Sequence, residues 1–471
     1  MLFTSFIFIL LLVVTFGLYY LPWFKYFQVY ILVVSSFIFY AYNEPILLLL
    51  LIFSPAVNIL TSYYITYGTR FNKKAIAILG VAVELAVLTF FKYSPLFSRT
   101  FFGSTSSVGH FLLMIPLPIG ISFFTFEGIS LVIDVYSEKY FDRKKYVSTS
   151  LFEHAKNIYC FISFFPHLIA GPIVKAHDFL PQIKSKTFTD IDWQSAFRTL
   201  VTGYFLKMVV ADNLKDFTFW IEYPYFLSAP SSKLIMMLIG YSCQIFADFA
   251  GYSLIAIGLA KLFGYNLMSN FNFPYISSSF KEFWKRWHIS LSSYLMEYLY
   301  IPLGGNKKGK VRTYIHLMVT MLLGGLWHGA SWSYAVWGGF HGFALAAERL
   351  LADFFKLKHN FFIIFLKRII VFAFVTLAWL LFKLTDFSHV IMYMKSLVNN
   401  WSMSSNLKES MLCMNIFYYS LPVFCYHALY LFSKSKHYYI FKRVEFLAYG
   451  IMLFFILTNS GEAGSFIYFQ F

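Results

Sequence analysis

The amino-acid sequence predicts an all-α polytopic membrane protein, built as one integral membrane domain over residues 1–471. Hydrophobic residues make up 59% of the chain and charged residues only 13%. Soluble domains average about 45–50% apolar and about 25% charged residues. The mean hydropathy of +0.64 points the same way. These values exclude disordered, collagen-like and secreted disulfide-rich proteins.

The second observation is that the apolar residues gather in long runs. Since a helix needs about 20 apolar residues to cross a bilayer, we predict about 11 to 13 membrane helices. The first run, residues 1–21, has no basic start and no small-residue cleavage site, so we expect a spanning helix and not a removed signal peptide. Further runs follow in order at residues 26–42, 45–66, 75–93, 110–136, 154–172, 195–220, 232–262, 313–327, 331–350, 361–382, 411–432 and 444–459.

Positive charge alternates between successive loops, which is the third observation. The chain carries 38 Lys and Arg against 22 Asp and Glu, a formal net charge of +16. Because loops rich in Lys and Arg stay in the cytoplasm, we expect both termini outside it. Clustering between apolar runs also argues against nucleic-acid binding. The basic clusters lie around residues 70–74, 139–145, 307–312, 356–368 and 434–443.

Two stretches break the pattern of plain spanning helices. Residues 166–192 mix Pro, Gly and charge, and residues 270–306 mix basic and aromatic residues with Gly and Pro. Irregular backbone at membrane depth is tolerated only where it is buried in protein or lines a cavity. We therefore expect both stretches to be re-entrant or interfacial segments that build a site.

His328 is the first candidate for chemistry, because it lies in LLGGLWHGASW among Gly324, Gly325, Gly329 and Ala330. Small residues let backbones and ligands approach closely and allow a helix to break. A histidine here can act as a general base, taking a proton from a hydroxyl that attacks a thioester or ester. From spacing alone, a structural histidine that donates to a helix carbonyl is an equal alternative.

Residues 281–288 (KEFWKRWH) form the second candidate. On a helix, Lys281 and Lys285 share one face and lie close to Arg286 and His288. Such a cluster can bind a phosphorylated donor such as coenzyme A. The alternative is an interfacial anchor, with tryptophans and cations at the headgroup level.

Carboxylates inside apolar runs need partners. Asp248, in IFADFAGYS, is expected to orient a histidine or to pair with a cation. Glu127, in SFFTFEGIS, raises the same question with weaker support. The four cysteines lie far apart and predict neither a zinc site nor a disulfide framework.

Six motifs together resemble the membrane-bound O-acyltransferase (MBOAT) family. They are FWKRWHISLS, YIPLGG, LLGGLWHGASW, ADFAGYSLIAIGLAKLFGYNL, LPIGISFFTFEGIS and FFPHLIAGPI. The resemblance covers a motif-rich core of residues 110–345 and is nearest to the bacterial branch that O-acetylates alginate or peptidoglycan. It implies a ring of tilted helices with re-entrant segments around a central tunnel that joins the two sides of the membrane.

The resemblance also implies roles for residues. His328 matches the family's catalytic histidine, His288 its second histidine, and Asp248 the acidic residue of its ADF-GYS motif. The end of the chain, FIYFQF, resembles an FxYFxF terminus that presents its tyrosine, here Tyr468, as an acyl relay. We therefore predict His328, His288 and Tyr468 as catalytic, with no metal and no permanently bound cofactor. The predicted substrate- and donor-binding residues are Asp248, Lys281, Trp284, Lys285, Arg286 and Trp327.

The function implied is transfer of acetyl groups from cytoplasmic acetyl-CoA across the inner membrane, within membrane lipid. A periplasmic SGNH-type partner, an O-acetyltransferase or esterase-like protein, would then acetylate a polysaccharide. Usage of Phe, Ile, Lys and Asn slightly favours peptidoglycan over an alginate-like polymer. One alternative is D-alanyl transfer from a carrier protein to teichoic acid, which would need a carrier-docking surface on residues 281–312. The others are a transporter or flippase for lipid-linked sugars and a non-catalytic scaffold.

Overall fold

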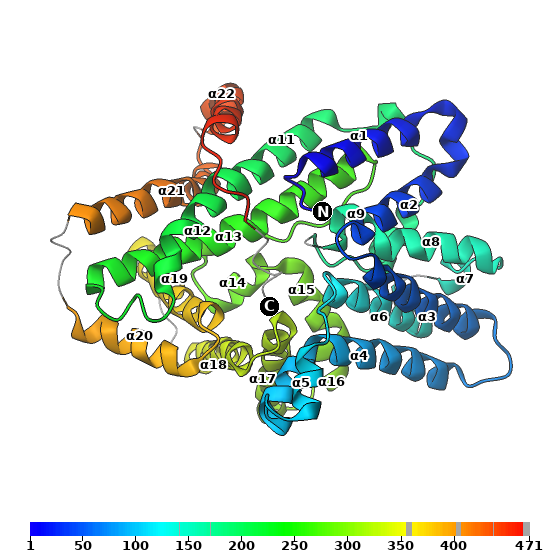
Figure 1. Cartoon of the computed structure of the whole chain (residues 1–471), viewed down its shortest axis with the longest axis horizontal. Helices are drawn as coiled ribbons and strands as arrows, with labels where there is room; N and C mark the ends of the chain where they lie inside the picture. Colours follow the sequence, from blue (N-terminus) through cyan, green and yellow to red (C-terminus); the bar gives the residue numbers. More distant parts are fainter. Residues whose placement is uncertain (141, 170, 355–359, 402–406, 437, 465–471) are drawn as a thin grey trace. The chain divides into compact units, whose positions relative to one another are not determined.

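The computed structural model describes residues 1–464 apart from 141, 170, 355–359, 402–406 and 437, and leaves side chains 352–354, 440 and 441 undescribed. Every regular element in this part of the chain is helical, as predicted (Figure 1). It forms two compact units, Met1–Leu200 with Ser253–Met268, and Val201–Tyr252 with Ser269–Phe471. Five stretches among the described residues are long and apolar enough to cross a membrane: Pro22–Ala41, Pro45–Tyr67, Lys73–Phe102, Ser231–Leu262 and Phe361–Lys383.

The first unit holds the N-terminal helices. The predicted runs at 26–42, 45–66 and 75–93 are confirmed as α2, α3 and α4. The unit contains α1 (Phe6–Tyr20), α2 (Gln28–Ala41), α3 (Leu48–Tyr67), α4 (Lys73–Phe97), α5 (Ser107–Leu113), α6 (Ile121–Ser137), α7 (Arg143–Tyr146), α8 (Leu151–Ser163), α9 (Phe165–Leu168), α10 (Ala176–Phe179) and the start of α11 (Trp193–Tyr204).

The prediction of one continuous run over 110–136 is wrong. The chain forms α5 and α6, with an irregular link that contains Pro116 and Pro118. Proline removes a backbone donor and cannot continue a helix, and Gly120 then turns the chain at φ +79°. The run at 154–172 is likewise divided into α8 and α9 at Phe164, and Pro166 lies in the first turn of α9.

The irregular segment 172–177 is buried along a polar stripe of α6. Backbone N–H groups of Val174 and Ala176 donate to Glu127 Oε1 at 3.2 Å and to Ser130 Oγ at 3.2 Å. His177 Nδ1 lies 2.7 Å from Oδ2 of the fully buried Asp134, one turn beyond Ser130 on α6. Glu127 and Asp134 are seven residues apart, so they share a face of α6. This agrees with the prediction that irregular backbone here is buried in protein.

The second unit holds the remaining helices. A π-helical segment, Phe205–Ala211, precedes α12, and α20 is a helix that the sequence did not predict. The unit contains α12 (Asp212–Thr218), most of α13 (Ser231–Leu262), α14 (Phe280–Arg286), α15 (Ile289–Leu295), α16 (Ile301–Leu303), α17 (Lys310–His328), α18 (Trp332–Phe354), α19 (Phe361–Lys383), α20 (Phe387–Asn399), α21 (Leu407–Phe432) and α22 (Tyr438–Thr458).

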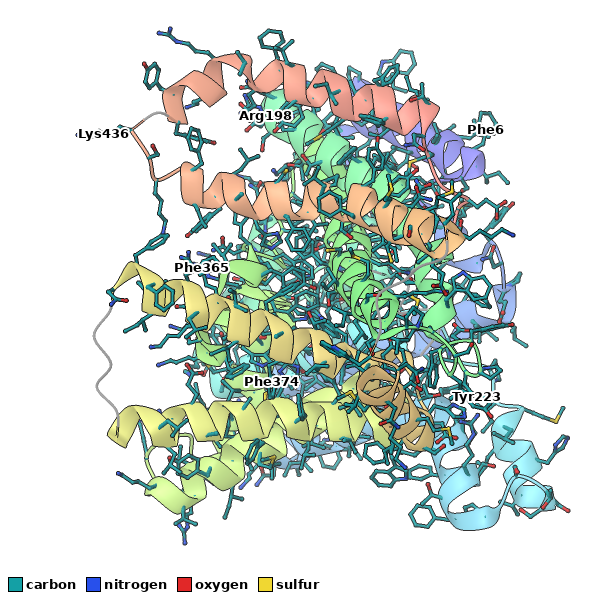
Figure 2. The ribbon with its side chains drawn as sticks, turned by 90° about the vertical axis from the view of Figure 1, so that its left-hand side faces the viewer. Phe6, Arg198, Tyr223, Phe365, Phe374 and Lys436 are labelled. Carbon is teal, nitrogen blue, oxygen red and sulfur yellow. The ribbon has the colours of Figure 1, made fainter. Side chains whose placement is uncertain are left out.

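Helices α17 and α18 pack backbone to backbone at two glycines. A Cβ on Gly338 would lie 2.1 Å from the Met321 carbonyl oxygen, and one on Gly325 would lie 2.1 Å from the Tyr334 carbonyl oxygen. Small residues permit this close approach between membrane helices. On the other side of α18, Phe340 stacks on Phe374 of α19 with ring centroids 4.1 Å apart (Figure 2). These contacts fix the C-terminal end of α17.

The glycine crossing leads to a stability prediction. Gly338→Ala should destabilise the protein by about 1–3 kcal/mol, because backbone atoms cannot move aside as a flexible side chain can. The measurement is the thermal unfolding midpoint in detergent. Gly17→Ala is the matched control, since a Cβ there meets nothing within 4 Å. Equal midpoints for the two variants would contradict the close crossing.

Candidate active site

His328 is the last residue of α17 and is only 3% exposed. Aromatic rings from three helices surround it. Ring centroids lie 5.2 Å away for Trp327, 5.2 Å for Trp337 of α18 and 5.4 Å for Phe382 of α19. The helix ends here because Gly329 is extended, and a Cβ on that glycine would lie 2.4 Å from the Tyr334 ring. His328 thus lies in an enclosure from which bulk water is excluded.

His288 lies beside His328 in the same unit, with ring centroids 6.3 Å apart. It is fully buried, and the Phe249 ring of α13 meets it edge to face at 4.6 Å. Neither ring nitrogen of His288 has a hydrogen-bond partner within the described part of the chain. Buried polar atoms are nearly always hydrogen-bonded, and exceptions need an explanation such as a ligand or water. The structure therefore brings together the two histidines that the sequence singled out.

The backbone of His288 is strained, with φ +42° and ψ +57°. Left-handed conformations outside glycine are uncommon and collect at functional sites. Asn270 stabilises the left-handed conformation of His288 through hydrogen bonds to the next two residues. Its carbonyl accepts from the Ile289 N–H at 2.9 Å, and its side-chain oxygen accepts from Ser290 Oγ at 2.6 Å. These bonds fix the backbone directly after His288.

The predicted donor-binding cations on α14 divide into two kinds. Lys281 and Lys285 are exposed. Arg286 is held in an ion pair with Glu282 at 2.9 Å and also donates to the Asn272 carbonyl at 2.9 Å. Burial alone would raise the pKa of Glu282, but hydrogen bonds from Ser278 and Arg286 hold that pKa below its usual value.

The rings of α14 connect its cations with the histidines. Trp284 contacts His341 of α18 with centroids 5.2 Å apart, and His341 contacts Trp337 at 4.8 Å. Both ring nitrogens of the fully buried His341 lack a partner among the described residues. His341 was not predicted from the sequence, although a histidine within the apolar run 331–350 is a functional candidate by default.

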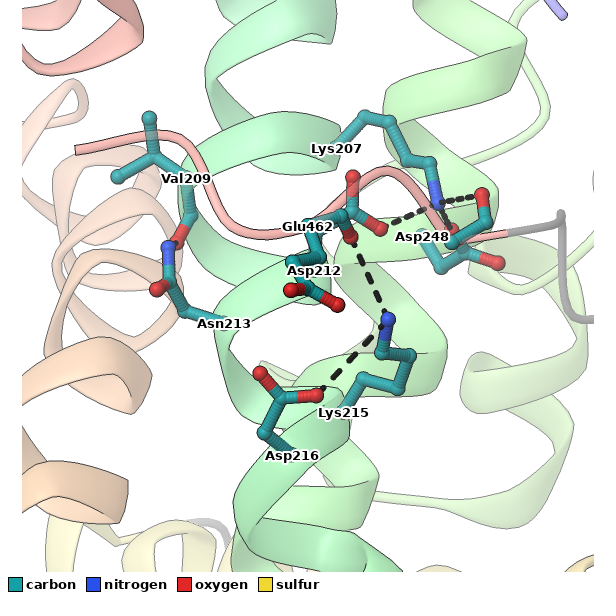
Figure 3. Close-up of polar contacts among 9 residues, drawn as sticks. Lys207, Val209, Asp212, Asn213, Lys215, Asp216, Asp248 and Glu462 are labelled. Atoms are coloured by element: carbon teal, nitrogen blue, oxygen red, sulfur yellow. Dashed lines mark hydrogen bonds and ion pairs between the residues drawn. The ribbon is translucent and has the colours of Figure 1, made fainter. Parts of the chain in front are cut away.

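Asp248 pairs with a cation, as one of the two predicted alternatives requires: its Oδ1 accepts from Lys207 Nζ at 2.7 Å (Figure 3). The same ammonium donates to Asp212 Oδ1 at 2.6 Å. Lys207 and Asp212 were missed because they lie inside the run 195–220, although charges within an apolar run are functional candidates by default. Tyr468 lies outside the described residues.

Comparison with known proteins identifies the family of the chain. The model of the membrane-bound O-acyltransferase family, MBOAT, matches residues 88–391, which include both histidines and Asp248. The chain belongs to the MBOAT family. Like its relatives, it is an O-acyltransferase and a multi-pass membrane protein.

Three bacterial relatives illustrate the similarity. Probable alginate O-acetylase AlgI of Pseudomonas putida is 38% identical over 366 residues, which are 74% of this chain and 71% of that protein. Peptidoglycan O-acetyltransferase of Helicobacter pylori is 36% identical over 391 residues, 78% of this chain and 73% of that protein. Teichoic acid D-alanyltransferase of Bacillus subtilis is 26% identical over 381 residues, 74% of this chain and 92% of that protein.

The strained histidine gives a prediction that separates chemistry from folding. His288→Asn should keep the fold, because asparagine tolerates the left-handed region, but should lose acyl transfer. His288→Val should be less stable than His288→Asn by about 1–2 kcal/mol, because a β-branched residue is disfavoured there. Thermal unfolding and transferase assays on both variants are the measurements. Full activity in the asparagine variant would exclude a chemical role for the ring.

Proposed function

We propose that this MBOAT protein transfers acetyl groups from cytoplasmic acetyl-CoA across the bacterial inner membrane for O-acetylation of a cell-envelope polysaccharide. The observation that carries the proposal is the buried pair His288 and His328, with ring centroids 6.3 Å apart in an aromatic enclosure. Two relatives, a probable alginate O-acetylase and a peptidoglycan O-acetyltransferase, support the acetyl group and the polymer class. We take peptidoglycan as the polymer, on composition.

The chemistry that we propose begins with the donor. The exposed cations Lys281 and Lys285 would attract the phosphates of coenzyme A on the cytoplasmic side, which suits ammonium groups as point charges. Trp284 and Trp327 would line the path of the donor arm along a central tunnel. Arg286 would shape the site through its ion pair with Glu282 rather than through the phosphates.

His328 would then act as the general base. It takes the proton of an acceptor hydroxyl, whose oxygen attacks the thioester carbonyl and forms a new ester bond as the carbon–sulfur bond breaks. The coenzyme A thiolate leaves and takes up a proton to give the free thiol. His288, with its unpartnered ring nitrogens, would hold the carbonyl or the hydroxyl in line.

The acceptor hydroxyl that we propose belongs to Tyr468. A phenol needs a base to attack and is afterwards a fair leaving group, so it can carry the acetyl group onward. A separate periplasmic SGNH-type partner would receive the group and place it on a sugar. In this proposal both termini lie outside the cytoplasm.

Labelling the purified protein with isotopic acetyl-CoA tests the proposal directly. We expect a labelled acetyl group on the C-terminal peptide by mass spectrometry, and we expect it to be lost in His328→Ala and in Tyr468→Phe. His389→Ala is a control, because His389 lies at a helix end and stacks on Tyr223. Acetyl-CoA binding without any label, in folded protein, would refute the tyrosine relay.

The same assay distinguishes acetyl transfer from D-alanyl transfer. The relative named teichoic acid D-alanyltransferase, aligned over 92% of its length, favours D-alanyl transfer as the second candidate. We expect label from acetyl-CoA and none from a D-alanyl carrier protein. The reverse result would replace acetyl by D-alanine as the transferred group. A His328→Ala variant that keeps full function in cells would favour a transporter or scaffold.

The proposed orientation predicts thiol accessibility in intact cells. In a variant without its native cysteines, Thr105→Cys should react with a membrane-impermeant maleimide from outside, and Lys308→Cys only after lysis. Both positions are exposed, so the difference reports the side of the membrane. The opposite labelling pattern would invert the topology and place both termini in the cytoplasm.

A further inference from the structure

The C-terminal segment of the chain is docked against a buried charge cluster in the second unit. We propose that Lys207, Asp212 and Asp248 form a positioning site for segment 459–464, and that this site sets where the following residues enter the acyl-transfer centre. The inference rests on the proposed function, because it concerns the route of the acyl group. None of the three residues contacts a reacting atom, so each would act through the segment that it holds.

The cluster places one ammonium between two carboxylates. Lys207 Nζ lies 2.6 Å from Asp212 Oδ1 and 2.7 Å from Asp248 Oδ1, and the three residues are between 1% and 4% exposed. Lys207 is in the π-helical segment Phe205–Ala211, and π-helical insertions are frequent at functional sites. Buried ion pairs contribute little net stability compared with apolar packing, so stability alone does not explain the cluster.

Gly251 lets α13 approach the π-helical segment closely enough for Asp248 to reach Lys207. A Cβ on Gly251 of α13 would lie 2.8 Å from the Lys207 backbone nitrogen and 2.9 Å from the Gly203 carbonyl oxygen. The close crossing brings Asp248, one turn earlier on α13, to the lysine. The ADFAG part of the sequence therefore supplies both the carboxylate and the space that it needs.

The C-terminal segment follows α22 and runs across this cluster (Figure 3). Lys207 Nζ donates to the Gly464 carbonyl at 3.2 Å, which gives the ammonium a third acceptor. The Gly461 N–H donates to the Met208 carbonyl at 2.9 Å. Two further side chains donate to the segment's carbonyls, Asn213 to Asn459 at 3.0 Å and Lys215 to Glu462 at 3.3 Å.

The docked segment fits closely at Gly461. A Cβ there would lie 2.6 Å from the Asp212 carbonyl carbon and 2.7 Å from the Asn213 nitrogen. Both are backbone atoms, which cannot rotate aside as a side chain can. Four hydrogen bonds, three accepted and one donated by the segment, thus bind a stretch whose residues 460–464 lie outside any helix.

The positioning site is joined to the active site through α13. Asp248 binds Lys207, and its neighbour Phe249 meets the His288 ring edge to face at 4.6 Å. One turn of helix thus contacts both the tail anchor and the active-site histidine. Tyr468 follows Gly464 by four positions in the sequence, so docking of the segment at this site would tether the tyrosine. A tether of this kind raises the effective concentration of the phenol at the histidines.

Gly461→Ala tests the inference without replacing any of the three buried charged residues. Gly450→Ala is its matched control, since a Cβ at Gly450 meets nothing within 4 Å. We expect Gly461→Ala to free the segment, so that carboxypeptidase removes the C-terminal residues faster than in wild type. We also expect kcat for acetyl transfer to fall by on the order of 10²-fold, because small misplacements of a reacting group cost about that much. The KM for acetyl-CoA and the thermal midpoint should stay at the values of Gly450→Ala.

A second variant distinguishes a loss of positioning from a folding defect. Asn213→Leu removes the hydrogen bond to Asn459 and leaves Lys207, Asp212 and Asp248 in place. It should reproduce the pattern of Gly461→Ala, with faster C-terminal digestion, lower kcat and unchanged KM.

Several results would overturn the positioning role. One is faster C-terminal digestion with a kcat equal to that of Gly450→Ala. Another is no change in either the digestion rate or kcat. A third is a parallel loss of acetyl-CoA binding and thermal stability. An inactive wild-type protein in the same assay would refute acetyl transfer itself, and the digestion rates would still show whether the segment is docked.

Discussion

Every polar backbone group at membrane depth needs a partner inside the protein, and this constraint governs the structure. The spanning helices meet it with their own hydrogen bonds. The irregular segments cannot, so side chains from other elements supply the partners. Glu127 and Ser130 of α6 accept from segment 172–177, and Asn270 accepts from residues 289 and 290. Glu127, a carboxylate inside an apolar run, is thus the partner of a particular stretch of irregular backbone.

The two histidines are positioned by different means. His328 ends a helix whose crossing with α18 is fixed by glycine contacts, and Gly329 stops the helix at that point. His288 lies on irregular backbone in a strained conformation that Asn270 maintains. A rigid helix end and a locked loop can both hold a side chain to the tolerance that catalysis needs. The strain at His288 persists because several hydrogen bonds hold the residues around it.

Many of the helices could be predicted from the sequence, because the length and hydropathy of an apolar run are local properties. The runs at 26–42, 45–66, 75–93, 232–262 and 361–382 became helices close to their expected bounds. The breaks before α6 and α9 were missed, because hydropathy continues through Pro116, Pro118 and Phe164 although the helix does not. The amphipathic helix α20 was missed because it is not a long apolar run.

The site was predictable only in part for a related reason. His328 and His288 were found because each lies in a distinctive local motif. The partner of Asp248 was not found, because Lys207 is 41 residues away and only the crossing at Gly251 joins them. The sequence also could not show which cations of α14 are free to meet a donor. Arg286 is engaged by Glu282 and Asn272, next to the strained turn at His288, whereas Lys281 and Lys285 are exposed. Pairing over long sequence separations is set by packing, and one sequence does not display it.

The buried charge cluster shows why such pairing carries function here. An apolar core would hold α12 and α13 together at least as well as one lysine between two aspartates. What an apolar core cannot do is offer a directed ammonium to the carbonyl of Gly464. A segment without helical hydrogen bonds needs directed donors to be fixed in one register, and hydrophobic contacts alone supply none. The cluster is therefore best understood as a device for placement, built where α13 also contacts His288.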